Sequence, residues 1–369
     1  MSSRTVTIIV VVLVVVALAT VWVYRGRQPE APPAAVPTGT RVEIAAPLGL
    51  PPVPIPADNP PTADTIALGR RLYYDPILSV DNTVSCATCH HPDFGFADGK
   101  QVSEGVGGKT GTRNSPTVFN AAYLTTQFWD GRASSLETQA EGPVENPVEM
   151  AHTLADVEQK LMADPSYRAE FKKAFRVDRI TYEMVEKAIA SFERTVVSGN
   201  SPFDRYFYGG DKTAVSESAK RGLEVFRNPK KGNCAVCHTI EENYALFTDN
   251  KFHNLGVGFT LQGEFTDPGR YNLTKNEADK SKFHTPSLRN IALTAPYLHD
   301  GSTKTLKDVI DFYIGGGNSN PNLDPEIHVL DFLTGRERAD LLAFLESLTG
   351  DMPPNVGPPG RGDQARAAP

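Results

Sequence analysis

The fold of this chain is decided by two short stretches, Cys86-Ala87-Thr88-Cys89-His90 and Cys234-Ala235-Val236-Cys237-His238. Both are C-x-x-C-H, and together they contain all four cysteines of the 369 residues. Two thiols at this spacing can each form a thioether with a vinyl group of one haem, and the histidine that follows can bind the iron as its proximal ligand. The sequence therefore predicts two covalently bound c-type haems, with His90 and His238 as iron ligands.

Two other kinds of site also use paired cysteines. A zinc site made of four thiolates usually brings its pairs from much closer positions in the sequence than these two motifs occupy. A thioredoxin-type redox pair needs a βαβ context, which the sequence pattern does not contain. A single motif would leave both alternatives open, but two copies that use every cysteine favour haem.

The segments around the motifs predict an internal repeat. Residues 69–74 precede the first motif and residues 220–226 precede the second, and each segment has the pattern of a short amphipathic helix. Ser216 is the expected N-cap of the second helix. We therefore expect two cytochrome c-like haem domains, residues 63–205 and residues 206–350.

The rest of the pattern predicts a mostly α fold with long loops. Apolar residues recur at helical spacing over residues 182–197. Thr305 is expected to open a helix that stops at the glycines 315–317, and Thr334 with Glu337 forms a capping box before another helix. Alternating strand patterns are rare.

The chain ends have distinct compositions. Residues 5–24 contain no charge, and this length can span a bilayer core, so residues 1–27 are expected to be a membrane anchor or a cleaved signal segment. Either alternative exports the rest of the chain to the periplasm, and the anchor would tether it to the inner membrane through residues 5–24. Residues 28–62 are expected to be a proline-rich linker, and residues 351–369 a disordered tail.

Composition excludes several classes of protein. Hydrophobic residues make up 40%, charged residues 22%, and the formal net charge is −7. These values are typical of a globular protein and not of a disordered or polytopic membrane protein. The acidic balance excludes nucleic-acid binding through a basic field.

With both motifs placed, residues 64–350 resemble the bacterial di-haem cytochrome c peroxidases and their MauG-type relatives. The resemblance depends on motifs outside the cysteines, namely GTRNSPT (111–117), QFWDGR (127–132), QAEGP (139–143) with Glu149-Met150, TPSLRN (285–290) and APYLHDG (295–301).

The resemblance implies that the N-terminal haem activates peroxide. Gln139, Pro143 and Glu149 would line its distal pocket, where the Glu149 carboxylate can take a proton from H2O2 and return it to the leaving oxygen. Many family members have a distal histidine in the loop where this chain has Val106. Valine cannot bind iron, so we expect an open haem that needs no reductive activation.

For the C-terminal haem the resemblance implies electron storage or relay. Tyr313 stands at the position where family peroxidases carry a methionine as sixth iron ligand, as in MauG-type enzymes. It shares a predicted helix face with Leu306 and Ile310, so it is expected to point inward, although an inward tyrosine is also typical of an ordinary core. Trp129 corresponds to the tryptophan between the haems that carries electrons, with an ordinary buried tryptophan as the alternative.

The resemblance also implies one calcium ion between the haems, held by Asn114, Thr294 and Pro296 through oxygen ligands. Five histidines receive no role and are expected to be structural or exposed, with His299 near a haem edge: His152, His253, His284, His299 and His328.

Three functions follow from this reading. The leading one is an oxidoreductase, a peroxidase that reduces H2O2 to water with electrons from a c-type cytochrome or a cupredoxin. The second is a MauG-like oxidase that uses peroxide to oxidise Trp or Tyr of a partner protein. The third is a non-catalytic di-haem electron carrier.

Overall fold

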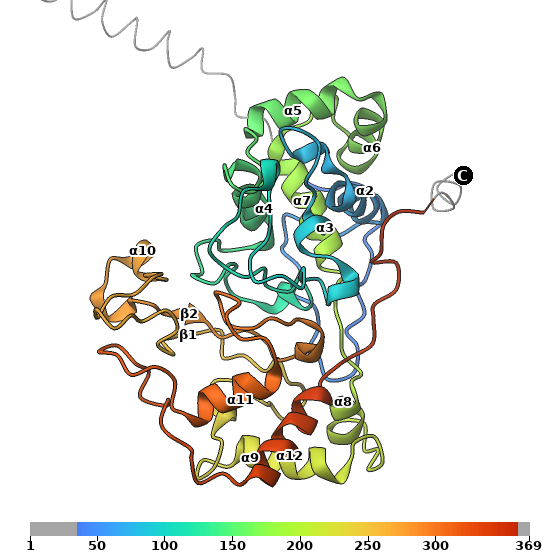
Figure 1. Ribbon diagram of the computed structural model, residues 1–369. Helices are drawn as coiled ribbons and strands as arrows, with labels where there is room; N and C mark the ends of the chain where they lie inside the picture. Colours follow the sequence, from blue (N-terminus) through green and yellow to red (C-terminus); the bar gives the residue numbers. More distant parts are fainter. Residues whose placement is uncertain (1–34, 361–369) are drawn as a thin grey trace, which may run out of the picture. The chain divides into compact units, whose positions relative to one another are not determined.

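The structure is a computed structural model that describes residues 35–360. The predicted anchor or signal segment, 1–27, and residues 361–369 lie outside the described residues. Across residues 35–360, every helix is too short or too polar to traverse a membrane. Residues from Val36 onward group into one compact unit, whose elements are shown in Figure 1.

The described chain is mostly helical, as expected, with one short antiparallel pair of strands. The helices of the first half are α2 (Ala63–Tyr74), α3 (Cys86–Cys89), α4 (Leu136–Glu145), α5 (Leu154–Ala163), α6 (Pro165–Phe175) and α7 (Tyr182–Glu193). The second half contains α8 (Pro202–Phe207), α9 (Glu217–Arg227), α10 (Tyr271–Thr274), α11 (Leu306–Ile314) and α12 (Gly335–Glu346), with strands β1 (Phe252–His253) and β2 (Phe283–His284).

The helix ends follow the local sequence. Ser216, Thr305 and Thr334 cap α9, α11 and α12 through their side chains, as predicted. The helix expected over residues 182–197 ends earlier, because α7 stops at Glu193.

The first core is built on the packing of α2 against α7. A Cβ at Gly69 would lie 1.8 Å from the carbonyl oxygen of Ala188, so only glycine allows the two helices to approach this closely. Tyr73 of α2 then meets Phe192 of α7, with ring centroids 5.1 Å apart. The first C-x-x-C-H begins at Cys86, after α2 ends at Tyr74 and a short 3-10 turn, Pro76–Leu78, follows.

The second core repeats this arrangement with α9 and α12. A Cβ at Gly222 would lie 1.9 Å from the carbonyl oxygen of Asp340. Phe226 and Phe344 meet with ring centroids 4.9 Å apart. The internal repeat predicted around the cysteine motifs therefore extends to the helix pair behind each of them.

Residues 28–62 were expected to be a linker, but the part of this segment that the structure describes packs against the folded unit. Residues 36–62 are extended, but they pack along the folded unit. The amide of Thr38 donates to Ala174 of α6 (2.8 Å), and the carbonyl of Gly49 accepts from the amide of Ala245 (3.0 Å) in the second half. Leu50 and Val53 are buried in a small cluster with Tyr123. Proline content could not show that apolar side chains between the prolines have partners.

The tail expectation for residues 351–369 also differs in its described part, 351–360. After α12 the chain returns to the first core, where Val356 is buried. The carbonyl of Val356 accepts from the Tyr74 hydroxyl (2.6 Å), and Arg70 donates to the carbonyl of Gly357 (2.6 Å). Long-range hydrogen bonds of this kind leave no local sequence signal.

The predicted domain boundary at 205/206 cuts through α8. Phe203 of this helix belongs to the second core, where it contacts Phe247 and Phe344. The change from one core to the other therefore precedes α8.

Candidate functional site

The first cysteine motif forms helix α3, and His90 caps its C-terminal end. The His90 ring atom Nδ1 lies 3.3 Å from the carbonyl oxygen of Phe96 and 3.1 Å from the Ser115 hydroxyl. Burial lowers the pKa of His90, so the ring is neutral. With the Nδ1 proton donated to the carbonyl, Nε2 keeps its lone pair, which is the state that binds iron.

The second motif repeats this geometry on a short 3-10 turn, Cys234–Val236. Nδ1 of His238 lies 2.9 Å from the carbonyl oxygen of Phe247, and burial lowers the pKa of this ring too. Both histidines are therefore oriented and neutral, as proximal ligands must be.

A cavity of about 290 Å³ opens beside the second motif. It is lined by Cys234, Cys237 and His238 on one side and by α11 on the other, with mostly apolar walls. An apolar chamber with two thiols, a neutral imidazole and few polar groups fits a haem.

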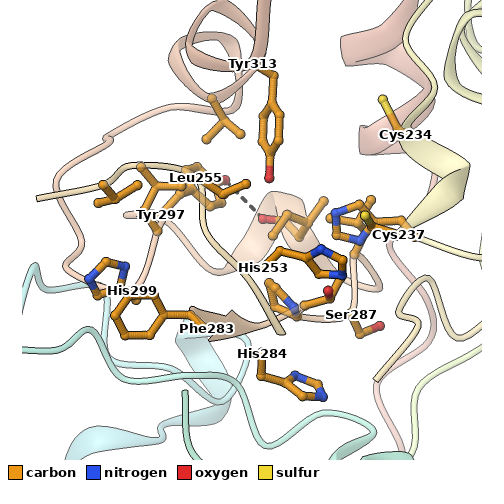
Figure 2. A pocket seen from close by; sticks show the side chains of 18 of the residues that line it. Cys234, Cys237, His253, Leu255, Phe283, His284, Ser287, Tyr297, His299 and Tyr313 are labelled. Atoms are coloured by element: carbon orange, nitrogen blue, oxygen red, sulfur yellow. Dashed lines mark hydrogen bonds between the residues drawn. The ribbon is translucent and has the colours of Figure 1, made fainter. Parts of the chain in front are cut away.

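Tyr313 of α11 points its hydroxyl into this cavity (Figure 2). Leu306 and Ile310 line the same cavity, so the predicted shared helix face is present. Within residues 35–360 the Tyr313 hydroxyl has no hydrogen-bond partner, and burial raises its pKa. The residue is half-buried and its hydroxyl faces the cavity, where it is available as a ligand to an iron ion.

The residues expected around the first haem come from α4 and the loop that follows it. Gln139 and Pro143 lie one turn apart on α4, and the carbonyl of Pro143 accepts from the amide of Met150 (3.1 Å), next to Glu149. Val106 is only 5% exposed, and its amide donates to the carbonyl of Glu149 (2.8 Å). The structure thus brings the apolar Val106 beside the main chain of Glu149.

The Glu149 carboxyl is largely withdrawn from water. Burial raises its pKa, while a hydrogen bond from Asn146 (2.7 Å) and the positive charge of Arg132 oppose that rise. A carboxyl with a raised pKa can exchange a proton closer to neutral pH than an exposed one.

Trp129 lies where the two halves of the folded unit meet, and it lines the same cavity. Its indole N–H donates to the carbonyl of Asn114 (2.9 Å), and its own carbonyl accepts from the amide of His284 on β2 (2.7 Å). Asn114 precedes Ser115, whose hydroxyl contacts His90. Two hydrogen bonds and one peptide bond therefore join Trp129 to the first proximal histidine.

The two halves meet through matching segments of the repeat. The amide of Asn114 donates to the carbonyl of His299 (2.7 Å), just as the amide of His284 donates to that of Trp129. Each of the turns that carry Trp129 and His299 is closed by an antiparallel β-bridge at matching positions. The bridge joins Gln127 to Ala133 in the first turn and Tyr297 to Thr303 in the second. Trp129 and His299 are thus equivalent positions, 6.5 Å apart between ring centroids.

The three residues proposed for calcium also line this cavity. Asn114 uses its side-chain NH2 on the carbonyls of Lys100 (2.9 Å) and Gln101 (3.3 Å), which leaves its amide oxygen available to a cation. Pro296 forms a cis peptide bond with Ala295, which follows Thr294. Residues from both halves thus line one chamber, and the calcium ion stays a prediction.

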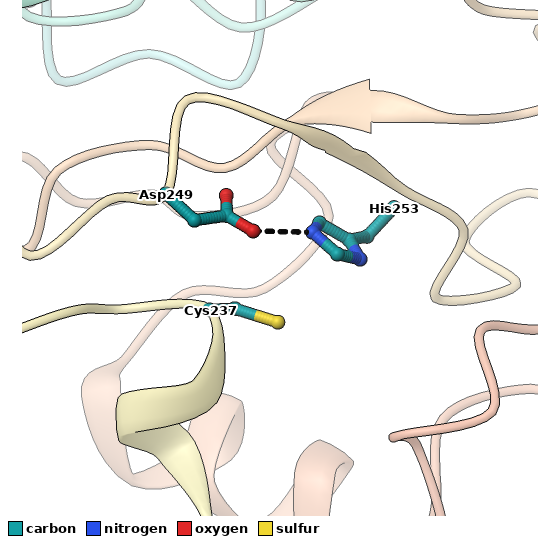
Figure 3. A group of neighbouring side chains, drawn as sticks. All are labelled: Cys237, Asp249 and His253. Carbon is teal, nitrogen blue, oxygen red and sulfur yellow. Dashed lines mark hydrogen bonds and ion pairs between the residues drawn. The ribbon is translucent and has the colours of Figure 1, made fainter.

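Two clusters were missed from the sequence. His253, expected to be structural or exposed, lies between the carboxylates of Asp324 (2.6 Å) and Asp249 (3.0 Å), beside Cys237 (Figure 3). Cys237 and then the two carboxylates, against the effect of burial, raise the pKa of His253 to about 10. Cys237, Asp249 and His253 have the spacing of a metal site, but Cys237 belongs to the haem motif, and we assign no metal to them.

The second missed cluster is an ion-pair network centred on Arg113. Its guanidinium donates to Asp267 (2.6 and 3.0 Å) and to Asp130 (2.7 Å). The sequence shows Arg113 and Asp130 inside two motifs, but only the fold brings Asp267 to them.

Comparisons with known proteins agree with this geometry. Residues 63–213 match the family described as di-haem cytochrome c peroxidase. The methylamine utilization protein MauG of Methylorubrum extorquens is 41% identical over 81% of this chain and 82% of its own. The cytochrome-c peroxidase IdrP1 of Denitromonas iodatirespirans is 40% identical over 82% of this chain and 86% of its own.

A solved structure has the same architecture. The crystal structure of a MauG-like protein associated with microbial copper homeostasis superimposes with a TM-score of 0.77 at 34% identity, covering 85% of this chain and 98% of that one. The repeated C-x-x-C-H motifs, the paired helix cores and these relatives lead to one conclusion: the chain belongs to the di-haem cytochrome c peroxidase family.

Proposed function

We propose that this protein is a di-haem c-type peroxidase that reduces H2O2 to two molecules of water. The peroxide takes up two electrons and two protons, and the electrons come from a c-type cytochrome or a cupredoxin. Cys86, Cys89, Cys234 and Cys237 form the thioethers, and His90 and His238 are the proximal ligands. A haem bound at His90 would supply the iron at which peroxide binds and its O–O bond is cleaved.

The observation that carries this proposal is the pairing of Val106 with Glu149. The buried valine offers no ligand atom, so its loop would leave the iron accessible. The neighbouring carboxyl has a raised pKa and can accept a proton from the bound peroxide and return it to the oxygen that leaves as water. Gln139 would position the peroxide, and Pro143 would shape the pocket.

The remaining residues have supporting roles in this proposal. Tyr313 is the sixth ligand of the His238 haem, because its hydroxyl has no other partner and points into the cavity. Trp129 conducts electrons between the two haems, since its indole lies at the junction of the halves. Asn114, Thr294 and Pro296 hold a calcium ion there.

The proposal includes export to the periplasm, with residues 5–24 as the inner-membrane tether. Periplasmic location agrees with c-type haem attachment and with a soluble donor. Cell fractionation, with and without residues 1–27, tests this part separately from the enzymology.

The peroxidase proposal is tested by the rate at which H2O2 oxidises a reduced cytochrome c in the presence of the purified holoprotein. Glu149→Gln should lower this rate by about 10²–10⁴-fold, the usual contribution of an acid–base group. Glu145→Gln is the matched control, because Glu145 is exposed at the end of α4. An equal loss in both variants, or no loss in either, would contradict the role of Glu149.

The second candidate function is MauG-type oxidation of a Trp or Tyr in a partner protein. Tyr313 favours it, because a phenolate ligand stabilises oxidised iron, in contrast to a thioether. If reduced cytochrome c is not turned over while peroxide modifies an aromatic residue of a partner, this second function replaces the first.

A further inference from the structure

We propose that Arg113 is a positioning residue that holds Trp129 in place between the two halves of the protein. The proposal rests on the electron-relay role of Trp129 given above. It assigns Arg113 no contact with substrate, and it concerns only the placement of the indole.

Arg113 connects two acidic residues that come from different halves. Asp130 follows Trp129 directly in the sequence and receives Nη1 of Arg113 at 2.7 Å. Asp267, far along the chain, receives Nε and Nη2 in a two-pronged contact at 2.6 and 3.0 Å. All three side chains are less than one-fifth exposed, so these ion pairs are poorly screened by water.

The turn that carries Trp129 is held from a second direction as well. Arg270 donates to the carbonyl of Asp130 (3.1 Å) and stacks on Phe252, 3.8 Å from its ring centroid. A Cβ at Gly131, whose φ is +73°, would lie 2.4 Å from the Phe252 ring, so the turn is pressed against the second half. Side chains from both halves thus determine where this turn lies.

The internal repeat shows that this arrangement is specific to the tryptophan side. Phe283 is the repeat equivalent of Arg113, and Asp300 is the equivalent of Asp130. Asp300 accepts a hydrogen bond from the amide of Ser302 within its own turn (3.1 Å), and no cation is paired with it among residues 35–360. Only the turn that bears the proposed electron relay has the two-sided ion pair.

Loss of Arg113 would leave two mutually repelling carboxylates close together at this junction. Asp130 would keep its longer contacts with Arg132 (3.2 and 3.3 Å), and Asp267 would keep the amide of Gly269 (2.8 Å). With the cation between them removed, the two carboxylates would move apart or take up water. Asp130 adjoins Trp129, so the movement would shift the indole and weaken its hydrogen bond to Asn114 (2.9 Å).

The experiment measures electron equilibration between the two haems after pulse radiolysis of the full-length holoprotein. Arg113→Gln should slow it by about tenfold or more, because a displacement of about 1 Å at a reacting group can cost up to about a hundredfold in rate. Asp267→Asn removes the charge of one partner of Arg113 while keeping the size of the side chain. It should slow the electron equilibration less than Arg113→Gln does. Arg113→Lys should fall between wild type and Arg113→Gln, since lysine cannot make the two-pronged contact.

Arg194→Gln is the matched control. Arg194 makes a comparable two-pronged pair with Glu137 (2.7 and 3.0 Å) inside the first half, away from Trp129. It should lower stability and leave the electron-transfer rate unchanged. In a Trp22→Phe background Trp129 is the only tryptophan, and its ultraviolet resonance Raman band for the indole N–H hydrogen bond should shift in Arg113→Gln but not in Arg194→Gln.

Trp129→Phe distinguishes the electron-relay role of Trp129 from the positioning role of Arg113. If Trp129→Phe does not slow equilibration, the relay role itself is wrong. If Trp129→Phe slows it while Arg113→Gln and Asp267→Asn behave as wild type, the relay stands and the positioning role of Arg113 is overturned. Equal slowing in Arg194→Gln would also overturn it, because the effect would then be one of general stability.

Discussion

Replacement of Arg289 by leucine should destabilise the protein and loosen its second haem site together. Arg289 is 1% exposed and Asp204 0%, and the two form a two-pronged ion pair with both N···O distances at 2.9 Å. The same guanidinium donates to the carbonyls of Ala245 and Gly49, each at 2.6 Å. Arg289→Leu therefore removes the counter-ion of one buried carboxylate and the donor to the carbonyl of Ala245, while the carbonyl of Gly49 keeps the amide of Ala245 (3.0 Å).

The expected cost follows from what is left unpaired. Removing one member of a buried ion pair costs about 3–5 kcal/mol, because the remaining charge is buried without a counter-ion. The amide and hydroxyl of Ser201 still donate to Asp204 (2.9 and 2.8 Å), which favours the lower end of that range. For a unit of this size that loss should lower the melting temperature by roughly 4–7 °C. Arg289→Leu with Asp204→Leu should recover part of it, since the double variant leaves no buried charge behind.

The same change should reach the iron site through the main chain. Ala245 lies two residues before Phe247, whose carbonyl accepts the Nδ1 proton of His238 (2.9 Å). Loss of the Arg289 contact to Ala245 allows this segment to move, so the orientation of His238 should vary more. The EPR signal of the His238 haem should therefore broaden at temperatures where the protein is still folded.

The assay is calorimetric or absorbance-detected unfolding of the holoprotein, with Arg168→Leu as control. Arg168 is exposed on α6, and its guanidinium makes one hydrogen bond within residues 35–360, to the carbonyl of Met162 (2.7 Å). Its variant should therefore stay within about 0.5 kcal/mol of wild type. Equal melting of Arg289→Leu and Arg168→Leu would refute the reasoning, as would a double variant less stable than the single one.

Three further outcomes are expected. Tyr313→Phe should remove the sixth ligand of the His238 haem and convert its EPR signal to high spin, and an unchanged signal would show that Tyr313 is only a core residue. Gly222→Ala should cost about 1–3 kcal/mol, because its Cβ would lie 1.9 Å from the carbonyl of Asp340, whereas an unchanged urea midpoint would show that α9 and α12 separate easily. Burial raises the pKa of Glu193 to about 8, with the charge of Arg194 opposing the rise and that of Glu137 adding to it. The folded protein therefore keeps a proton on Glu193 that the unfolded chain loses near pH 4.5. The free energy of unfolding should fall as the pH rises from about 4.5 to 8. Glu193→Gln should flatten that fall, and a parallel pH profile in the variant would count against it.

Local sequence determined the parts of this protein that depend on neighbouring residues. The spacing of C-x-x-C-H predicted two haem attachment sites, which stay a prediction. Ser216, Thr305 and Thr334 marked helix starts correctly, because a cap is formed within one turn of the chain. The family followed from motifs that are continuous in the sequence.

Tertiary structure alone decided what joins distant residues. The packing of residues 36–62 and 351–360 on the folded unit, the pairing of Arg289 with Asp204, and the junction of Arg113, Asp130 and Asp267 all depend on contacts across long stretches of chain. A proline-rich or polar segment looks the same in the sequence whether its carbonyls meet water or a buried arginine. Burial sets that difference, and burial is a property of the assembled fold.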